Sequence, residues 1–326
     1  MKWSENEIEI LKQNYECNGV DYIKMILPDR TKKGIVWKVG DLGLKVNREL
    51  YNLRISRTKL NTTKPFNLYK VNPDIFLNID SKEISYILGF LWADGYIRND
   101  CISMWLKKDD SENIKHIFDS TGIWNNYYRK LKGRKEQMSF HTHNKYIFNF
   151  LVENDYLSKS YVNQSKILSL IPNELKHYFF RGYFDGDGSI WMKNNQCIMN
   201  ITSTYEQDWS VIEELFNNLD IRYTTSCYDD KNRKSKCSRI VTQNMNGIVK
   251  FFNYIYQNDD MGLKRKLNTF LKIKVKYDNI VMKNKKIKEN NSCTHCESKN
   301  FITKGNYKNN KKRYMCKDCN RTFIGI

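Results

Sequence analysis

Two stretches of the sequence, ILGFLWADGYI at residues 87–97 and FRGYFDGDGSI at residues 180–190, follow one pattern at a distance of 93 residues. Aligned, they share four positions: Gly89 with Gly182, Asp94 with Asp187, Gly95 with Gly188, and Ile97 with Ile190. Each copy reads as the end of a buried helix that closes on an aspartate and a glycine. An acidic side chain at a helix C-terminus is disfavoured by a few tenths to about 1 kcal/mol, because the helix dipole is negative there. A glycine cap beside an exposed aspartate would explain one copy, but the second copy indicates a function.

The sequence after each copy also repeats. After the first copy, the pattern predicts strands at 95–99 and 101–107, a helix at 110–122, strands at 126–131 and 137–143, and a helix at 144–154. After the second copy, it predicts strands at 188–193 and 197–203, a helix at 205–219, strands at 222–229 and 238–243, and a helix at 246–257. We therefore expect an α+β fold with two αββαββα subdomains, residues 81–155 and 172–272, related by a pseudo-twofold axis and joined by a linker at 156–171.

Small residues predict how the two subdomains meet. They recur at a spacing of four in each motif helix, as Gly89 and Ala93 and as Gly182 and Gly186. This spacing puts them on one helix face, and small side chains at a contact let two helices approach closely. Asp94 and Asp187 would then emerge side by side and repel each other. A divalent cation reverses that balance, so the two aspartates are predicted to be metal ligands.

The paired motifs ILGFLWADG and FRGYFDGDG resemble those of LAGLIDADG homing endonucleases in their single-chain, two-motif form. The resemblance covers about residues 81–272. It implies antiparallel sheets that form a saddle over the DNA major groove. It also implies cleavage of both strands of a long double-stranded target by a monomer. Asp94 and Asp187 take the role of the aspartates that bind Mg²⁺ or Mn²⁺.

The first motif departs from the family pattern at Trp92, where many members have aspartate and the second copy has Asp185. The later acid is the essential one in this family, so catalysis is not put in doubt, and Asp185 is interpreted as a local cap. The family usually places a basic residue after the third helix of each half. Lys159 and Lys264 are the candidates here, either to stabilise developing charge in the transition state or to contact phosphate.

Nine strand residues are candidates to face DNA, although one sequence does not fix the phase of a strand. They are Trp105, Lys107, Arg129, His141, His143, Lys193, Tyr228, Arg239 and Gln243. The chief alternative function is a non-cleaving LAGLIDADG-type RNA maturase or DNA-binding regulator. A purely binding protein has no reason to keep both acids, so we favour the endonuclease.

The charge distribution separates the core from its flanks. The 326-residue chain has 55 basic and 36 acidic residues, a net charge of +19 that predicts a polyanionic partner. Residues 65–263 are neutral, residues 1–64 carry +5 and residues 264–326 carry +14. The basic flanks are therefore predicted to grip nucleic acid around a catalytic core.

The N-terminal flank predicts three short helices. Ser4 and Glu7 form a capping box, and Thr31 caps a third helix that carries Lys32, Lys33 and Lys38 on its outer face. Residues 1–47 resemble a Myb/SANT-like helix-turn-helix module, whose third helix would enter the major groove. A helical bundle without DNA contact is the alternative. Residues 48–80 read as a basic linker.

The C-terminal flank contains two C-x₂-C pairs, Cys293 with Cys296 and Cys316 with Cys319, separated by 19 residues. This spacing strongly predicts a tetrahedral site for one structural Zn²⁺. Residues 291–326 resemble a zinc ribbon of transposase-type proteins, with 273–290 as a basic linker.

No apolar run is long enough to span a membrane, and the N-terminus does not read as a signal peptide. We expect a soluble intracellular protein, in the cytoplasm of a bacterial or phage-infected cell or in an organelle.

Overall fold

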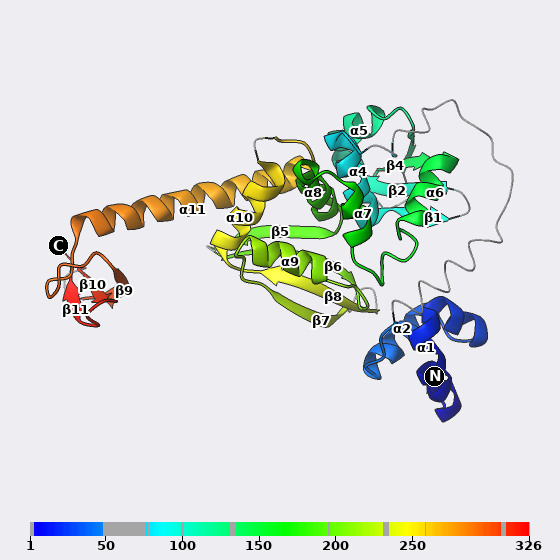
Figure 1. The fold of residues 1–326 in the computed structure, drawn as a ribbon, viewed down its shortest axis with the longest axis horizontal. Coiled ribbons are helices and arrows are strands. Elements are labelled where there is room, and N and C mark those ends of the chain that lie inside the picture. Colours follow the sequence, from blue (N-terminus) through cyan, green and yellow to red (C-terminus); the bar gives the residue numbers. More distant parts are fainter. Residues whose placement is uncertain are drawn as a thin grey trace. The chain divides into compact units, whose positions relative to one another are not determined.

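The computed structural model describes residues 3–47, 76, 79–98, 101–130, 133, 135–194, 196–230, 235–257, 259–307 and 311–325. It forms two compact units, Met1–Phe270 and Leu271–Ile326 (Figure 1). The predicted basic linker at 48–80 lies almost wholly outside the described residues. No helix in the described part of the chain is both long enough and apolar enough to cross a bilayer.

The predicted internal repeat is confirmed. The first half contains α4 (Lys82–Asp94), β1 (Tyr96–Arg98), β2 (Cys101–Lys107), α5 (Lys108–Asp119), β3 (Asn125–Arg129), β4 (Gln137–Thr142) and α6 (Lys145–Glu153). The second half contains α8 (Lys176–Asp187), β5 (Gly188–Lys193), β6 (Gln196–Thr204), α9 (Ser210–Asn218), β7 (Thr224–Asp230), β8 (Ser235–Thr242) and α10 (Met245–Tyr256). Both sheets are antiparallel and have the same topology, β1-β2-β4-β3 and β5-β6-β8-β7. The fold is the expected α+β architecture.

The motif helices α4 and α8 pack directly against each other. Ser81 caps α4 by accepting a hydrogen bond from the Ile84 backbone N–H. Both helices are buried on almost every side. This fits the apolar sequence of α4, whereas α8 also buries the polar side chains of His177, Arg181 and Asp185. A Cβ atom built on Gly89 would lie 1.9 Å from the Phe179 carbonyl oxygen, and one on Gly182 would lie 2.0 Å from the Tyr86 carbonyl oxygen. The two backbones are therefore in contact where the glycines face each other.

Each sheet has one buried face and one open face. In β2 the buried residues alternate with more exposed ones, so Ile102, Met104 and Leu106 point into the core. In β6 the corresponding core residues are Cys197, Met199 and Ile201. The opposite faces carry polar and aromatic side chains.

The connections between these elements are more regular than the sequence predicted. The segment read as a linker at 156–171 contains the helix α7 (Ser165–Leu170), and the 3₁₀ turn η2 (Asn173–Leu175) leads into α8. The segment read as a basic linker at 273–290 is helical and belongs to α11 (Lys264–Asn290).

The N-terminal residues form a small helical module with its own core. α1 (Glu5–Ile26) is interrupted at Gly19, whose φ of 65° is a left-handed conformation that glycine adopts readily, and α2 (Lys32–Asp41) follows. The predicted capping box of Ser4 and Glu7 and the Thr31 cap are present. The core consists of Leu11, Tyr15, Ile23, Ile35, Val39 and Val46.

The second unit ends in a three-stranded sheet. Its strands are β9 (Phe301–Asn306), β10 (Lys312–Cys316) and β11 (Thr322–Ile324), in the order β11-β10-β9. Phe301, Tyr314 and Phe323 pack together with two cysteines in a core too small to resemble that of an ordinary domain.

Candidate active site at the helix ends

Asp94 and Asp187 are the last residues of α4 and α8. Asp94 is exposed and Asp187 is half-buried. The helix ends lie beside each other, because a Cβ atom on Gly186 would be 2.3 Å from the Ala93 Cβ and 3.5 Å from Asp94 Oδ2. The close approach at the glycines therefore brings two carboxylate-bearing helix ends together.

The glycines after the two aspartates are required by space. Gly95 and Gly188 have φ values of −65° and −78°, so neither is a left-handed cap. A Cβ atom on Gly95 would lie 2.4 Å from the Leu91 carbonyl oxygen, and one on Gly188 would lie 2.3 Å from the Phe184 ring. The chain turns sharply from helix to strand here, and only glycine fits.

A lysine ammonium group closes each of the two helix ends. Lys159 Nζ donates to the carbonyl oxygens of Leu91, Ala93 and Gly95 at 2.9, 2.9 and 2.8 Å. The last carbonyls of a helix have no partner within the helix, and a cation is favourable there. The lysine thus offsets the unfavourable combination of a helix C-terminus and an aspartate.

Lys266 does the same in the second half. Its Nζ atom donates to the carbonyl oxygens of Phe184, Asp185 and Gly188 at 2.6, 2.7 and 2.6 Å. In the aligned motifs, Phe184 and Gly188 correspond to Leu91 and Gly95, whereas the third carbonyl, that of Asp185, lies one residue before the equivalent of Ala93. All three donors of each ammonium group are used by the backbone.

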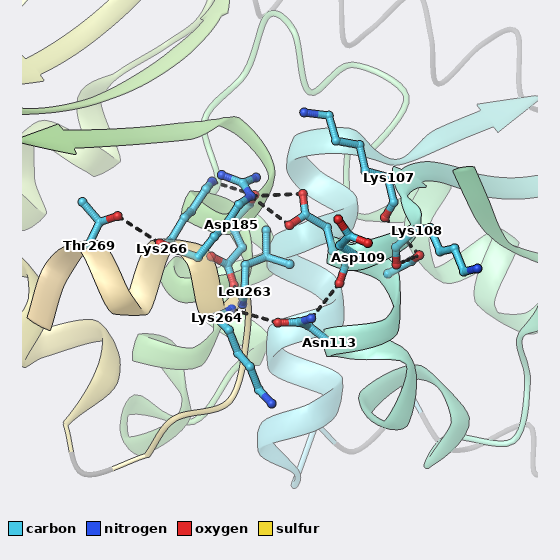
Figure 2. Close-up of polar contacts among 12 residues, drawn as sticks. Lys107, Lys108, Asp109, Asn113, Asp185, Leu263, Lys264, Lys266 and Thr269 are labelled. Carbon is cyan, nitrogen blue, oxygen red and sulfur yellow. Dashed lines mark hydrogen bonds and ion pairs between the residues drawn. The ribbon is translucent and has the colours of Figure 1, made fainter. Parts of the chain in front are cut away.

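The sequence predicted that Lys264 is the equivalent of Lys159. In the structure Lys266, two residues later, takes that position. Lys264 is exposed, whereas Lys266 is buried. In Figure 2 the Lys264 side chain points away from Asp185 while Lys266 points toward it. The backbone N–H of Lys264 donates instead to Asn113 Oδ1 at 3.2 Å. The start of α11 is thereby turned so that its third residue faces the helix end.

The environments of the two lysines are electrostatically similar. Burial lowers the pKa of Lys159 to about 8, and the negative charges of Asp187 and Asp94 act against this shift. Burial also lowers the pKa of Lys266 to about 8, and Asp185 is the main group that opposes it. Both ammonium groups interact with both site aspartates. The four groups therefore form one charged cluster.

Asp185 is not the local cap that the sequence suggested. The residue is 2% exposed, and its Oδ2 atom accepts hydrogen bonds from the Tyr86 hydroxyl at 2.8 Å and the Leu263 N–H at 2.9 Å. Burial raises its pKa. Trp92, at the equivalent position of the first half, is buried as well and packs edge-on against Tyr156.

Residues 174–256 match a family model described as "LAGLIDADG-like domain". The second half of the repeat is a LAGLIDADG-like domain. The match spans η2 to α10 and includes the motif helix α8 with Asp187.

Several solved structures are similar in fold, at low identity. The homing endonuclease I-WcaI bound to its DNA recognition sequence is 19% identical, with 71% of this chain and 98% of that chain covered and a TM-score of 0.41. I-LtrWI, a LAGLIDADG homing endonuclease bound to target DNA, is 13% identical, with 62% and 92% covered and a TM-score of 0.41. DUF199/WhiA from Thermatoga maritima is 16% identical, with 69% and 66% covered and a TM-score of 0.39. No curated protein matches the sequence.

The strand register now fixes which side chains lie on the open face of the first sheet. Trp105 is paired with Ser139, and Lys107 and Arg129 are both paired with Gln137. Because Ile102, Met104 and Leu106 are buried, their odd-numbered neighbours face outward. The predicted residues Trp105, Lys107, Arg129 and His141 lie on this face, together with the exposed Tyr127, which the sequence did not single out.

Arg129 is held in place on that face. Its guanidinium group lies 3.6 Å from the centroid of the Trp105 ring, and its Nε and Nη2 atoms donate to Gln137 Oε1 at 3.2 and 3.0 Å. Stacking and hydrogen bonding together restrict a side chain that is otherwise flexible.

The open face of the LAGLIDADG-like domain has a similar character. Lys193 pairs with Gln196, Tyr228 with Cys237, and Arg239 with Thr202, all on the face opposite the core. Arg239 lies 4.8 Å from the Tyr228 ring and donates to Ser226 Oγ at 3.2 Å. His143 and Gln243, also predicted, fall just beyond the ends of β4 and β8.

The four predicted zinc ligands of the second unit come together. The Sγ atoms of Cys293, Cys296, Cys316 and Cys319 all lie within 4.8 Å of one another. The Sγ atoms of Cys293 and Cys319 are 3.6 Å apart, and those of Cys296 and Cys316 are 3.5 Å apart. Four thiolates at Zn–S distances of about 2.3 Å lie at similar mutual distances, so the group fits a tetrahedral metal ion.

The predicted DNA-binding lysines lie on α2 of the N-terminal module. Lys32 and Lys33 are exposed and Lys38 is half-buried, in a helix whose buried residues are Ile35 and Val39. Lys32 forms an ion pair with Asp21.

Proposed function

We propose that this protein is a site-specific double-strand DNA endonuclease that hydrolyses phosphodiester bonds with divalent cations held by Asp94 and Asp187. The observation that carries the proposal is the paired site, in which two aspartates end two tightly packed helices and each helix end is closed by a lysine ammonium group. Two equivalent sites suit a reaction that must cut two antiparallel strands. The LAGLIDADG-like domain match supports the same reaction class.

The donor set of the site fits Mg²⁺ or Mn²⁺. Mg²⁺ is usually bound through one or two carboxylates while water and substrate phosphates complete its coordination. Asp94 and Asp187 offer carboxylates of this kind near the surface, and no other acid is needed. When bound, a divalent cation would polarise the phosphodiester and lower the pKa of attacking water.

Lys159 and Lys266 act by positioning. Their three N–H donors are engaged by backbone carbonyls, so they hold the turn that carries each aspartate and place positive charge beneath it. This charge favours two carboxylates close together, because an opposite charge nearby offsets their mutual repulsion. Lys264, which is exposed, is available to contact phosphate.

The open faces of the two sheets are proposed to bind the DNA duplex. Each face presents aromatic and basic side chains whose arginine is already held in one orientation, Arg129 on the first and Arg239 on the second. Pre-ordered arginines suit bidentate hydrogen bonds with guanine in the major groove. A long target site follows from the use of two sheets.

The flanking modules are proposed to add affinity. Lys32, Lys33 and Lys38 would contact DNA from the N-terminal module, which we propose to be of the helix-turn-helix type. A Zn²⁺ ion bound by the four cysteines would stabilise the C-terminal ribbon, since so small a core needs one. We propose that the protein acts as a monomer inside the cell, where its target lies.

The test is to incubate the purified protein with Mg²⁺ and the genomic DNA that flanks its own coding sequence. A discrete double-strand cut, absent in a protein carrying both Asp94→Asn and Asp187→Asn, is the expected result. Specific binding of this DNA without any cut would contradict the endonuclease and favour a regulator. Specific binding to the flanking transcript instead would favour an RNA maturase.

A further inference from the structure

The segments that carry Lys159 and Lys266 are held against the motif helices by different interactions. In the first half, Tyr156 lies three residues before Lys159, donates its hydroxyl to the Leu88 carbonyl at 2.9 Å and packs edge-on against Trp92 at 4.9 Å. In the second half, Leu263 lies three residues before Lys266 and donates its N–H to Asp185. Asp185 occupies the position of Trp92 in the aligned motifs. An aromatic contact in one half is thus replaced by a buried carboxylate in the other.

Asp185 belongs to a buried polar cluster that fastens the connector between α10 and α11. Arg181 is fully buried and donates to the carbonyl oxygens of Ile255, Tyr256 and Met261 at 2.6, 2.9 and 3.0 Å. It also pairs with Asp259 at 3.2 Å. Arg181 thereby holds both ends of the connector onto α8.

The connector is shaped to receive the Asp185 carboxylate. Gly262 has a φ of +120°, and a Cβ atom there would lie 2.5 Å from Asp185 Oδ2. The carboxylate therefore approaches the backbone at Gly262, where only glycine fits. It accepts a hydrogen bond from the N–H of the next residue, Leu263. Three residues later, Lys266 reaches the carbonyls at the end of α8. Among the described residues, Asp185 is the one α8 side chain that is hydrogen-bonded to Leu263.

We propose that Asp185 is a positioning residue of the second site, where it fixes Leu263 and so directs Lys266 to the helix end that carries Asp187. This inference rests on the proposed endonuclease function. It predicts a separable effect, because the first half uses Trp92 and Tyr156 for the same purpose. Loss of the Asp185 carboxylate should impair one of the two sites and leave the other intact.

The experiment uses Asp185→Leu, which is similar in shape but accepts no hydrogen bond, with Trp92→Leu as the matched change in the first half. Cleavage of each strand is measured in single turnover on end-labelled target DNA. Lys266→Met and Lys159→Met identify the strand that depends on each site. Asp185→Leu should slow the strand that depends on Lys266 by about 10-fold or more, with DNA affinity and the other strand within about 3-fold of wild type. Trp92→Leu should slow the opposite strand.

A second readout does not require cleavage. Hydrogen exchange of the amides at 261–267 should become faster in Asp185→Leu, while exchange at 155–161 stays as in wild type. Equal slowing of both strands, or faster exchange throughout α4 and α8, would overturn the positioning role. A wild-type protein that never cuts would instead refute the endonuclease, and the exchange pattern would still decide whether Asp185 holds the connector. Asp185→Asn, which keeps one acceptor oxygen, should give a smaller change of the same pattern if Asp185→Leu folds poorly.

Discussion

Gly89 and Gly182 face each other across α4 and α8, so that a methyl group on either would overlap a backbone carbonyl oxygen of the opposite helix, that of Phe179 or of Tyr86. Carbonyl oxygens within a helix cannot move aside without breaking hydrogen bonds. The position of both site aspartates therefore depends on the absence of two methyl groups.

Gly182→Ala is expected to destabilise the protein. Overpacking costs about 1–3 kcal/mol or more, and the clash here is with backbone, so the melting temperature should fall sharply. Gly40→Ala in α2 is a suitable control, because its Cβ would meet only the flexible end of a lysine side chain. Thermal unfolding followed by circular dichroism measures both. A Gly182→Ala melting temperature equal to that of wild type would mean that the helices do not pack through these glycines.

Asp94→Asn and Asp187→Asn are each expected to abolish double-strand cleavage while DNA binding is largely retained. Each substitution removes a proposed metal ligand from one of two equivalent positions, so nicked product should accumulate. Supercoiled plasmid carrying the target separates nicked from linear product on a gel, and a binding assay in Ca²⁺ gives the affinity. Linear product formed by both variants at the wild-type rate would show that these acids are not catalytic.

Lys266→Met should reduce both stability and cleavage, whereas Lys264→Met should change stability by no more than about 0.5 kcal/mol. Removing the buried ammonium takes a donor from the carbonyls of Phe184, Asp185 and Gly188, of which that of Phe184 keeps the Gly188 N–H. An unsatisfied buried group costs about 1–3 kcal/mol. Urea unfolding and single-turnover cleavage of the two proteins compare the adjacent positions directly. A larger loss of stability and cleavage in Lys264→Met than in Lys266→Met would show that Lys264 is the lysine of the second site.

Asp259 should make the free energy of unfolding depend on pH in the acid range. Burial raises its pKa, but hydrogen bonds from Lys82 and Met261 and the charge of Arg181 outweigh burial and hold the pKa at about 2. Because this lies below the unfolded value of about 3.9, the stabilisation is complete above that value and is lost as the pH falls toward 2. With the side chain 20% exposed, solvent screening limits the effect to about 1 kcal/mol.

Unfolding midpoints in urea for wild type and Asp259→Asn, measured between pH 3 and pH 6, test this. The difference between the two proteins should shrink below about pH 4. Asp220→Asn, whose side chain is 97% exposed beside Lys250, is the control and should show a smaller difference. A difference in unfolding midpoint between wild type and Asp259→Asn that stays constant over the whole pH range would contradict the lowered pKa of Asp259.

Removal of residues 283–326 is expected to leave a folded protein with weaker and less salt-sensitive DNA binding. Each lost phosphate contact should lower the slope of log K against log salt by about 0.9. Cys316→Ser should produce a similar binding defect, since it removes one of the four clustered cysteines proposed to bind zinc, while Cys227→Ser changes an exposed thiol outside the cluster. Cleavage of saturating DNA should persist in all three. Equal salt slopes for full-length and shortened protein would mean that this flank does not touch the DNA backbone.

Much of this molecule could be predicted from its sequence, because the two copies support each other. The αββαββα order and its repetition follow from apolar periodicity, and the cysteine spacing is distinctive. The lysine of the second site was misplaced, because the sequence does not reveal how far the connector turns before α11 begins. A signal was present nonetheless, since Leu263, Lys266, Phe270 and Ile273 share one helical face and all four are buried.

Asp185 could not be interpreted from the sequence for a different reason. Its partners are Tyr86 from the other half and a backbone N–H at Leu263, and neither leaves a pattern near residue 185. The phase of each strand was similarly open until the register fixed it. The features that the sequence did not predict are therefore those that depend on contacts between distant segments.

The hydroxyl of Tyr86 has a consequence for the modularity of the two halves. The residue at the same place in the second motif is Phe179, which has no hydroxyl. A symmetric homodimer assembled from two copies of the second half would therefore bury Asp185 twice, each time with one hydrogen-bond donor fewer than here. The halves share a topology but are no longer interchangeable parts, and any attempt to recombine them with motifs from other chains must carry a tyrosine to meet this aspartate.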